Sequence, residues 1–299
     1  MSISRSVLVL ILLGSLAAGA LGPLRAAERP VDPTFMYRRL DAAQARPSEI
    51  STASCRYKPL FGAGDKQSKE TRVVVGVSRF GELVVDPGGA SARVSYAAEE
   101  QAYFVLSGEG LLSYGATEHP LVANDFLYLP PGIEYDVSNP KDAPLRILVM
   151  GYHIPEGTEL TIPDKLLIAN TRLAKKQVVG NHPDSTLYQL LMGATDSKRD
   201  VIAAGHVLTS LFLMDIKPGG TNNPHHHATE EEIYLILEGK GDMVAGGGAD
   251  GLEGRSPVTA GDAFFIRLNA TVGFYADSNL ESGNALVLAV RSRYPFRRR

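Results

Sequence analysis

Residues 217–241 read KPGGTNNPHHHATEEEIYLILEGKG, and they repeat an earlier stretch, DPGGASARVSYAAEEQAYFVLSGEG, at residues 86–110. A single offset of 131 residues aligns the two stretches without a gap. The same offset aligns LFGAGDK at residues 60–66 with LMGATDS at residues 191–197. Self-similarity at one fixed spacing indicates two copies of one unit, joined at about residues 153–180.

Each unit consists of short apolar segments rich in β-branched and aromatic residues. The first contains VVVGVS, ELVV, QAYFVLSGEGLLSYG, DFLYLP and LRILVMGY, which are separated by Gly, Pro, Asn and Asp. The second contains VLTSLFLMDI, EIYLILEGKGDMV, DAFFIRL and ALVLAVRSRY in the same order. Many short strands at close spacing predict an all-β fold, a sandwich or a barrel, with helical patterns confined to connections.

The N-terminus has the plan of a secretory signal peptide. Arg5 precedes an apolar run that begins at Val7 and passes into the small residues of GSLAAGALG. We expect cleavage within residues 1–27 and an exported protein, periplasmic or secreted, that is not embedded in a membrane once this segment is removed. An uncleaved anchor is the alternative, but the run is short for a membrane span and is diluted by glycine and serine.

Charge and cysteine content narrow the partners and the means of stabilisation. The formal net charge is -3, so nothing in the composition draws the whole molecule to nucleic acid. Cys55 is the only cysteine, so an internal disulfide is impossible and the core alone must stabilise the mature protein. We expect a small molecule, rather than nucleic acid, as the ligand or substrate.

The histidines of the opening stretch have the spacing of metal ligands. Residues two apart on a strand face the same way, so His225 and His227 point together while His226 points away. Glu232 then opens the next apolar strand. Two imidazoles and one carboxylate that converge form a site with open positions for water, dioxygen or substrate. The alternative is a solvated loop rich in His and Glu.

At these residues the chain resembles a known family. The spacing of Gly219, His225, His227, Glu232 and Gly239 is similar to the first sequence motif of the cupin superfamily, without a gap. Because the unit is repeated, the chain resembles a bicupin over nearly all of its mature length. The resemblance implies two tandem jelly-roll barrels, each able to hold a metal ion in its interior.

The resemblance also gives expected boundaries. After the signal peptide at residues 1–27, residues 28–153 would form an N-terminal barrel without metal ligands. Residues 154–299 would form a C-terminal barrel with the metal site. Cupin barrels often associate through exposed sheet edges, so the family implies a homodimer.

The second unit departs from the family's second motif. Arg267 replaces the usual proline, Asn269 the glycine and Val272 the histidine that acts as a further ligand. Either the centre works with three ligands, or another group completes it, for which His206 and Tyr275 are candidates.

Arg267 falls at the expected rim of the metal cavity. There it could hold a substrate carboxylate through two hydrogen bonds. The alternative is a surface arginine paired with a neighbouring acid such as Asp262.

The first unit has lost the ligands of the motif. Val94, Tyr96 and Gln101 stand where the second unit has His225, His227 and Glu232, and Tyr135 stands where the family has a histidine. These side chains bind divalent metals poorly. We expect a metal-free, structural barrel; the alternative is that Tyr96 and Tyr135 line a small-ligand cavity.

Two functions remain after these observations. The first is a metal-dependent enzyme, dioxygenase-like or acting by Lewis-acid chemistry on a small organic substrate, with one divalent ion held by His225, His227 and Glu232. Iron or manganese suits this ligand set best, and zinc or nickel is compatible. The second is a non-catalytic bicupin that binds a small ligand or has a structural role, because one fold serves many functions.

Overall fold

The computed structural model describes most of the chain after the N-terminal segment. The chain divides into two units, Met1–Val31 and Asp32–Arg299, and the expected signal peptide falls outside the described residues. The described residues belong to the second unit and are 34–62, 65, 76–247, 253–281 and 283–293. Within these ranges, no helix is long and apolar enough to cross a membrane.

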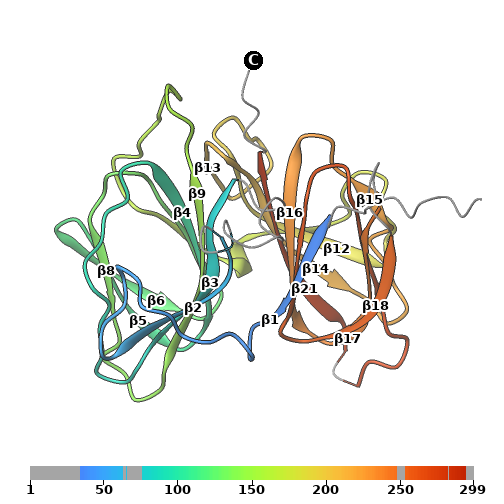
Figure 1. The fold of residues 1–299 in the computed structure, drawn as a ribbon, viewed down its shortest axis with the longest axis horizontal. Helices are drawn as coiled ribbons and strands as arrows, with labels where there is room; N and C mark the ends of the chain where they lie inside the picture. The colour runs from blue at the N-terminus through green and yellow to red at the C-terminus, as the bar shows by residue number, and fades with distance from the viewer. Residues whose placement is uncertain (1–33, 63–64, 66–75, 248–252, 282, 294–299) are drawn as a thin grey trace, which may run out of the picture. The chain divides into compact units, whose positions relative to one another are not determined.

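The second unit contains two β-barrels, and the first is built from two sheets (Figure 1). A six-stranded sheet has the order β10-β7-β4-β9-β3-β2, and a three-stranded sheet has the order β6-β5-β8. Its core packs Leu112 and Val137 of the small sheet against Leu127 of the large one. The bounds of these strands are β2 (Cys55–Gly62), β3 (Val77–Val85), β4 (Glu99–Ser107), β5 (Glu109–Tyr114), β6 (Thr117–Val122), β7 (Asp125–Leu129), β8 (Tyr135–Ser138), β9 (Leu145–His153) and β10 (Leu167–Asn170).

The second barrel has the same plan. An eight-stranded sheet has the order β1-β19-β16-β21-β14-β12-β11, with β13 beside β12, and a four-stranded sheet has the order β15-β20-β17-β18. The predicted all-β fold of two tandem jelly-roll barrels is confirmed. The bounds are β1 (Phe35–Arg39), β11 (Lys176–Gln177), β12 (Thr186–Ala194), β13 (Ile202–Gly205), β14 (Leu208–Ile216), β15 (His225–His226), β16 (Glu230–Glu238), β17 (Lys240–Gly246), β18 (Gly254–Thr259), β19 (Asp262–Ile266), β20 (Thr271–Ala276) and β21 (Ala285–Arg293), with a 3-10 helix, η3, at Thr171–Leu173.

The barrels exchange their first strands. β1 precedes the first barrel but pairs with β19 of the second, whereas β10 follows the first barrel and pairs with its β7. Each exchanged strand covers an edge whose N–H and C=O groups would otherwise lack partners. The expected boundaries at 28–153 and 154–299 therefore do not separate the two sets of sheets.

Two equivalent glutamates fasten the barrels together. Buried Glu100 accepts hydrogen bonds from the backbone N–H groups of His206, Val207 and Leu208. Glu231, at the same position of the second repeat, accepts one from the N–H of Gly76. A shared apolar cluster lies beside these contacts and includes residues of both large sheets. Bonds from backbone N–H groups to a buried carboxylate are among the stronger hydrogen bonds, so the two barrels form one packed body.

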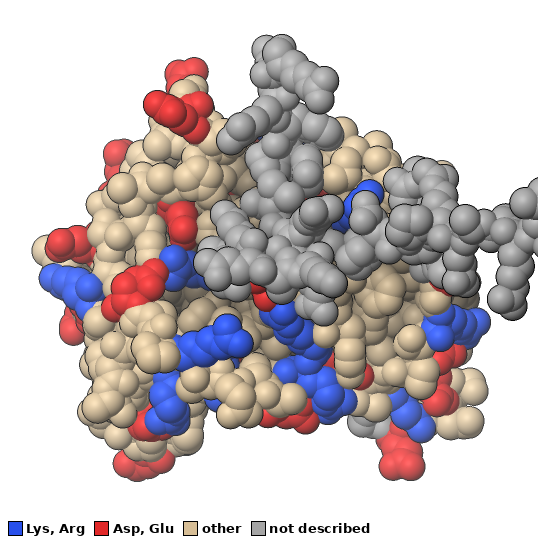
Figure 2. All heavy atoms as spheres, in the orientation of Figure 1, with Lys and Arg blue, Asp and Glu red and all other residues tan. Residues whose placement is uncertain are grey.

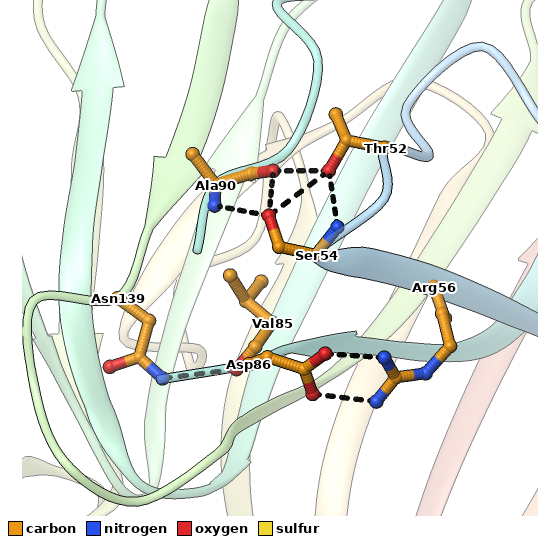
Figure 3. A network of polar contacts seen from close by, with 7 residues as sticks. All are labelled: Thr52, Ser54, Arg56, Val85, Asp86, Ala90 and Asn139. Atoms are coloured by element: carbon orange, nitrogen blue, oxygen red, sulfur yellow. Dashed lines mark hydrogen bonds and ion pairs between the residues drawn. The ribbon is translucent and has the colours of Figure 1, made fainter. Parts of the chain in front are cut away.

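The repeated Pro-Gly-Gly turn has the same backbone conformation in both barrels, and a serine hydroxyl accepts from the N–H after it in each, Ser54 from Ala90 and Ser185 from Thr221. Gly88 and Gly219 take positive φ values of 69° and 71°, a region that favours glycine. Around the first turn, Ser54 Oγ accepts from the Ala90 N–H at 3.2 Å, and Arg56 pairs with Asp86 (Figure 3). The shared backbone conformation explains why both glycines of the turn are kept in the two repeats.

The surface carries charges of both signs. On the face drawn in Figure 2, Lys and Arg side chains are interspersed with Asp and Glu. Exposed ion pairs include Arg93 with Asp136 at 2.8 Å and Arg255 with Asp242 at 2.9 Å. This mixture agrees with the small net charge of -3.

Candidate metal centre

Two neighbouring segments of the second barrel carry the three predicted ligands. The two-residue strand β15 pairs with β20, with His225 opposite Val272. His226 is exposed while His225 and His227 are half-buried, as the alternation of side chains on a strand requires. Glu232 lies three residues into β16, opposite Ile266 on one side and Arg291 on the other.

The structure brings His225, His227 and Glu232 together. One ligand atom from each lies within 4.8 Å of the others. His227 Nε2 is 3.2 Å from Glu232 Oε2, and the two imidazole rings are 4.9 Å apart between centroids, nearly perpendicular. The predicted convergence of the three side chains is therefore present in the fold.

Glu232 is the most unusual member of this group. Its side chain is 2% exposed, and neither carboxylate oxygen accepts a hydrogen bond. Burial by itself raises the pKa of the Glu232 carboxyl, but the neighbouring His227, Arg291 and His225 outweigh it and hold that pKa below its ordinary value. The carboxylate is therefore ionised. It forms ion pairs with His227 at 3.2 Å and with Arg291 Nε at 3.9 Å but accepts no hydrogen bond, and a bound cation would satisfy it more fully.

The imidazole of His225 is prepared as a ligand. Its Nδ1 donates to the backbone carbonyl of Asn223 at 2.9 Å, which leaves Nε2 without a proton. Burial lowers the pKa of His225 below its ordinary value, so the ring is neutral at neutral pH. Two imidazoles and one ionised carboxylate fit a divalent metal ion.

Arg291 is a site residue that the sequence reasoning missed. It lies on β21, in register with Glu232, and lines a cavity of about 240 Å³ together with the three ligands. Its Nη1 is 3.3 Å from Glu230 Oε2, and its guanidinium lies 5.5 Å from the centre of the Phe212 ring. Its Nε is buried and has no hydrogen-bond partner. The alternation along ALVLAVRSRY turns every second residue inward, and this pattern could have indicated that Arg291 faces the interior of the barrel.

Three other predicted residues lie elsewhere. Arg267 is not among the residues that line the cavity, because the chain turns away after β19 and its N–H bonds Thr34. His206 Nδ1 lies 3.2 Å from the Tyr128 hydroxyl, and its Nε2 accepts from the Thr161 N–H at the contact between the barrels. Tyr275 lies under Arg255 and lines another hollow. Neither His206 nor Tyr275 is placed to complete the ligand set.

The pairing suggested for Arg267 is absent too. Asp262 instead pairs with Arg39 at 2.8 Å and accepts from the Tyr37 hydroxyl at 3.0 Å, both on the exchanged strand β1. The carboxylate therefore fastens β1 to β19.

The first barrel has a different arrangement at the equivalent place. Arg79 projects from β3 and pairs with Glu49 at 2.7 Å and Glu99 at 3.1 Å. It also donates to the hydroxyl of Tyr96, over whose ring its guanidinium lies at 4.1 Å. Tyr135 is buried and shares a hydrogen bond with Tyr103 at 3.1 Å. The residues that replace the ligands are thus packed around a paired arginine.

This fold and these motifs define the class of protein. The cupin domain matches residues 81–151 and 212–288, one stretch in each barrel, and the chain belongs to the cupin superfamily as a bicupin. The first motif keeps its metal-ligand residues in the C-terminal barrel.

Known relatives are distant in sequence and close in fold. An uncharacterized protein of Methanocaldococcus jannaschii is 27% identical over 117 residues, which are 37% of this chain and 94% of that protein. A putative glyoxylate-induced protein from Pseudomonas aeruginosa has a TM-score of 0.68 and 16% identity, covering 92% of this chain and 94% of that chain. Oxalate decarboxylase from Bacillus subtilis, a protein with Mn(II) centres, has a TM-score of 0.60 and 11% identity, covering 88% and 78%.

Proposed function

We propose that this chain is a metal-dependent enzyme that acts on a small organic carboxylate in the second barrel. His225, His227 and Glu232 would hold one divalent metal ion, and Arg291 would hold the substrate. The observation that carries the proposal is the Glu232 carboxylate, buried, ionised and without a hydrogen bond beside two imidazoles.

The charge of the cavity supports a carboxylate substrate. Two arginines, Arg199 and Arg291, and one carboxylate, Glu232, line the cavity. Because metal-bound imidazoles are neutral, a divalent ion would add to this positive charge, which an anionic ligand neutralises. The Nε of Arg291 makes no hydrogen bond and lies 3.9 Å from Glu232 Oε1, and a guanidinium binds a carboxylate through two parallel hydrogen bonds.

The size of the cavity limits the substrate. About 240 Å³ is smaller than the usual pocket for a drug-sized ligand, of roughly 300–1,000 Å³. Phe212, Tyr234 and Leu190 supply apolar walls, which exclude water and strengthen the attraction between the charges inside. A compact mono- or dicarboxylate fits these limits.

Each side chain then has a defined part. Arg291 orients the carboxylate, and Glu230 holds Arg291 while lying 3.8 Å from His227 Nδ1. When bound, the metal would supply Lewis-acid or redox chemistry at positions that the three ligands leave open. Iron or manganese is the proposed ion, and the Mn(II) centres of a bicupin of similar fold support manganese.

We also propose that the protein is exported, because its N-terminal segment is apolar and follows an arginine.

The test compares metal content and turnover in matched variants. We expect about one equivalent of iron or manganese in the wild-type protein and in His226→Ala, whose side chain is exposed, and none in His227→Ala. Small carboxylates, with oxalate first, are then screened with and without oxygen. No metal in the wild-type protein after reconstitution would refute the metal centre. Metal without turnover of any carboxylate would favour a binding role.

A further inference from the structure

A third histidine lines the same cavity from a different part of the chain. His182 lies in the loop between β11 and β12, where its N–H bonds the carbonyl of Val179 at 3.2 Å. Its ring is 5.2 Å from the ring of His225, close to the 4.9 Å between His225 and His227. Three imidazoles therefore follow one another along one wall of the cavity.

The ring of His182 is fixed as His225 is. Its Nδ1 bonds the backbone carbonyl of Asn222, and a carbonyl only accepts, so this nitrogen carries a proton and Nε2 is the nitrogen available to a metal ion. Asn222 is itself immobilised, since its side chain donates to the Tyr234 hydroxyl and accepts from the Phe274 N–H, both at 2.7 Å. Neighbouring carbonyls, those of Asn222 and Asn223, thus orient two rings of the cavity and leave a free nitrogen on each.

The strand beside His225 offers no competing ligand. Val272, opposite His225 on β20, is fully buried in the apolar core. On the other side, His182 packs against the Tyr188 ring at 5.3 Å. A further protein nitrogen for an ion at this place can therefore come from the loop of His182.

We propose that His182 is an additional metal ligand, binding through Nε2 once the ion is present. The inference rests on the proposed metal centre. His182 lies outside the group whose ligand atoms are within 4.8 Å of one another, so its ring would have to move closer to them as the metal binds. The centre would then have three imidazoles and one carboxylate, from three separate segments of the second barrel.

The test counts the nitrogens around a bound ion. The protein is stripped of metal and loaded with Cu²⁺, which binds nitrogen ligands strongly. Pulsed electron paramagnetic resonance then gives the number of coordinated imidazoles. We expect three in the wild-type protein and in His226→Ala, and two in His182→Ala. His182→Gln keeps a donor for the Asn222 carbonyl but has no imidazole, so it should also show two even if the alanine variant folds poorly.

A titration with Mn²⁺ gives a second readout. We expect His182→Ala and His182→Gln to bind the ion roughly ten-fold or more weakly. Free imidazole should restore the three-nitrogen signal in His182→Gly. Two coordinated imidazoles in the wild-type protein, with unchanged affinity in both variants, would overturn the role of His182 and leave the metal centre intact. No binding by the wild-type protein would instead overturn the centre itself.

Discussion

Each barrel has an arginine in the same pair of neighbouring strands, β3 and β9 in the first and β14 and β21 in the second. The arginine is on the first strand of the pair in one barrel and on the second strand in the other. In the first, Arg79 on β3 lies across from Gly151 on β9. In the second, the pair is reversed, with Ser210 on β14 across from Arg291 on β21. A Cβ added to Gly151 would come within 2.5 Å of Arg79 Cγ, so the first barrel leaves no room for a side chain across from its arginine.

The exchange of position changes what each arginine can do. Arg79 has two carboxylates and a tyrosine hydroxyl as partners, which use its donors within the barrel. Arg291 keeps a buried Nε without a hydrogen bond, 3.9 Å from Oε1 of the Glu232 carboxylate, which also lacks hydrogen bonds. The arginine of the first barrel is thus satisfied by side chains of that barrel, whereas Arg291 and Glu232 of the second keep hydrogen-bonding capacity for a ligand.

The largest effect is expected when the metal ligands of the second barrel are replaced by the equivalent residues of the first. His225→Val with Glu232→Gln copies Val94 and Gln101 and removes an imidazole and the carboxylate. We expect metal affinity to fall by roughly 100-fold or more, measured by titration of the stripped protein with Mn²⁺. His226→Ala is the control, and tight binding by the double variant would contradict the site.

Removing the arginine of the first barrel should cost stability. Arg79→Met leaves Glu49 and Glu99 without their shared cation. Because these carboxylates are partly exposed, at 51% and 20%, we expect a loss of about 2 kcal/mol in the free energy of unfolding, less than for a fully buried pair. Urea denaturation measures it. Arg93→Met, which breaks an exposed pair, should cost less than about 1 kcal/mol; equal losses would show that Arg79 is not an internal counter-ion.

Arg291→Lys tests whether the arginine of the second barrel binds a carboxylate ligand. The change keeps the charge but removes the paired donors, so we expect carboxylate affinity to fall about 10-fold in the Mn²⁺-loaded protein. Calorimetric titration of the Mn²⁺-loaded protein with oxalate measures this affinity. Metal affinity should change little, and Arg267→Lys should behave as the wild-type protein. A similar loss in the Arg267 variant would restore that residue as the substrate contact.

The smallest effect is on the pH dependence of the metal-free protein. Because the pKa of His225 is lowered by burial, the unfolded chain takes up a proton near pH 6.5 that the folded chain does not. The free energy of unfolding should therefore fall as the pH drops below about 6.5, by at most about 1.4 kcal/mol per pH unit for this group.

Val94, the counterpart of His225 in the first barrel, cannot titrate. His225→Val should consequently flatten the dependence on pH, whereas His226→Ala should leave it as it is. Urea denaturation at about pH 7.5 and about pH 5.5 makes the comparison. An unchanged slope in His225→Val would assign the acid sensitivity to another group.

The sequence by itself determined the repeat, the all-β class, the family and the group of His225, His227 and Glu232. These features are local. The alternation of side chains on a strand turns His225 and His227 the same way, and only four residues separate His227 from Glu232. The repeated Pro-Gly-Gly turn is local too, because a positive φ at one residue selects glycine.

The tertiary structure alone decided which distant residues join this group. Arg291 reaches the cavity through the register of β16 on β21, and His182 through a loop that neither family motif includes. The same packing directs His206 to the contact between barrels and exchanges strands β1 and β10. Strand register and the pairing of edges depend on the whole sheet, so no short stretch of sequence encodes them.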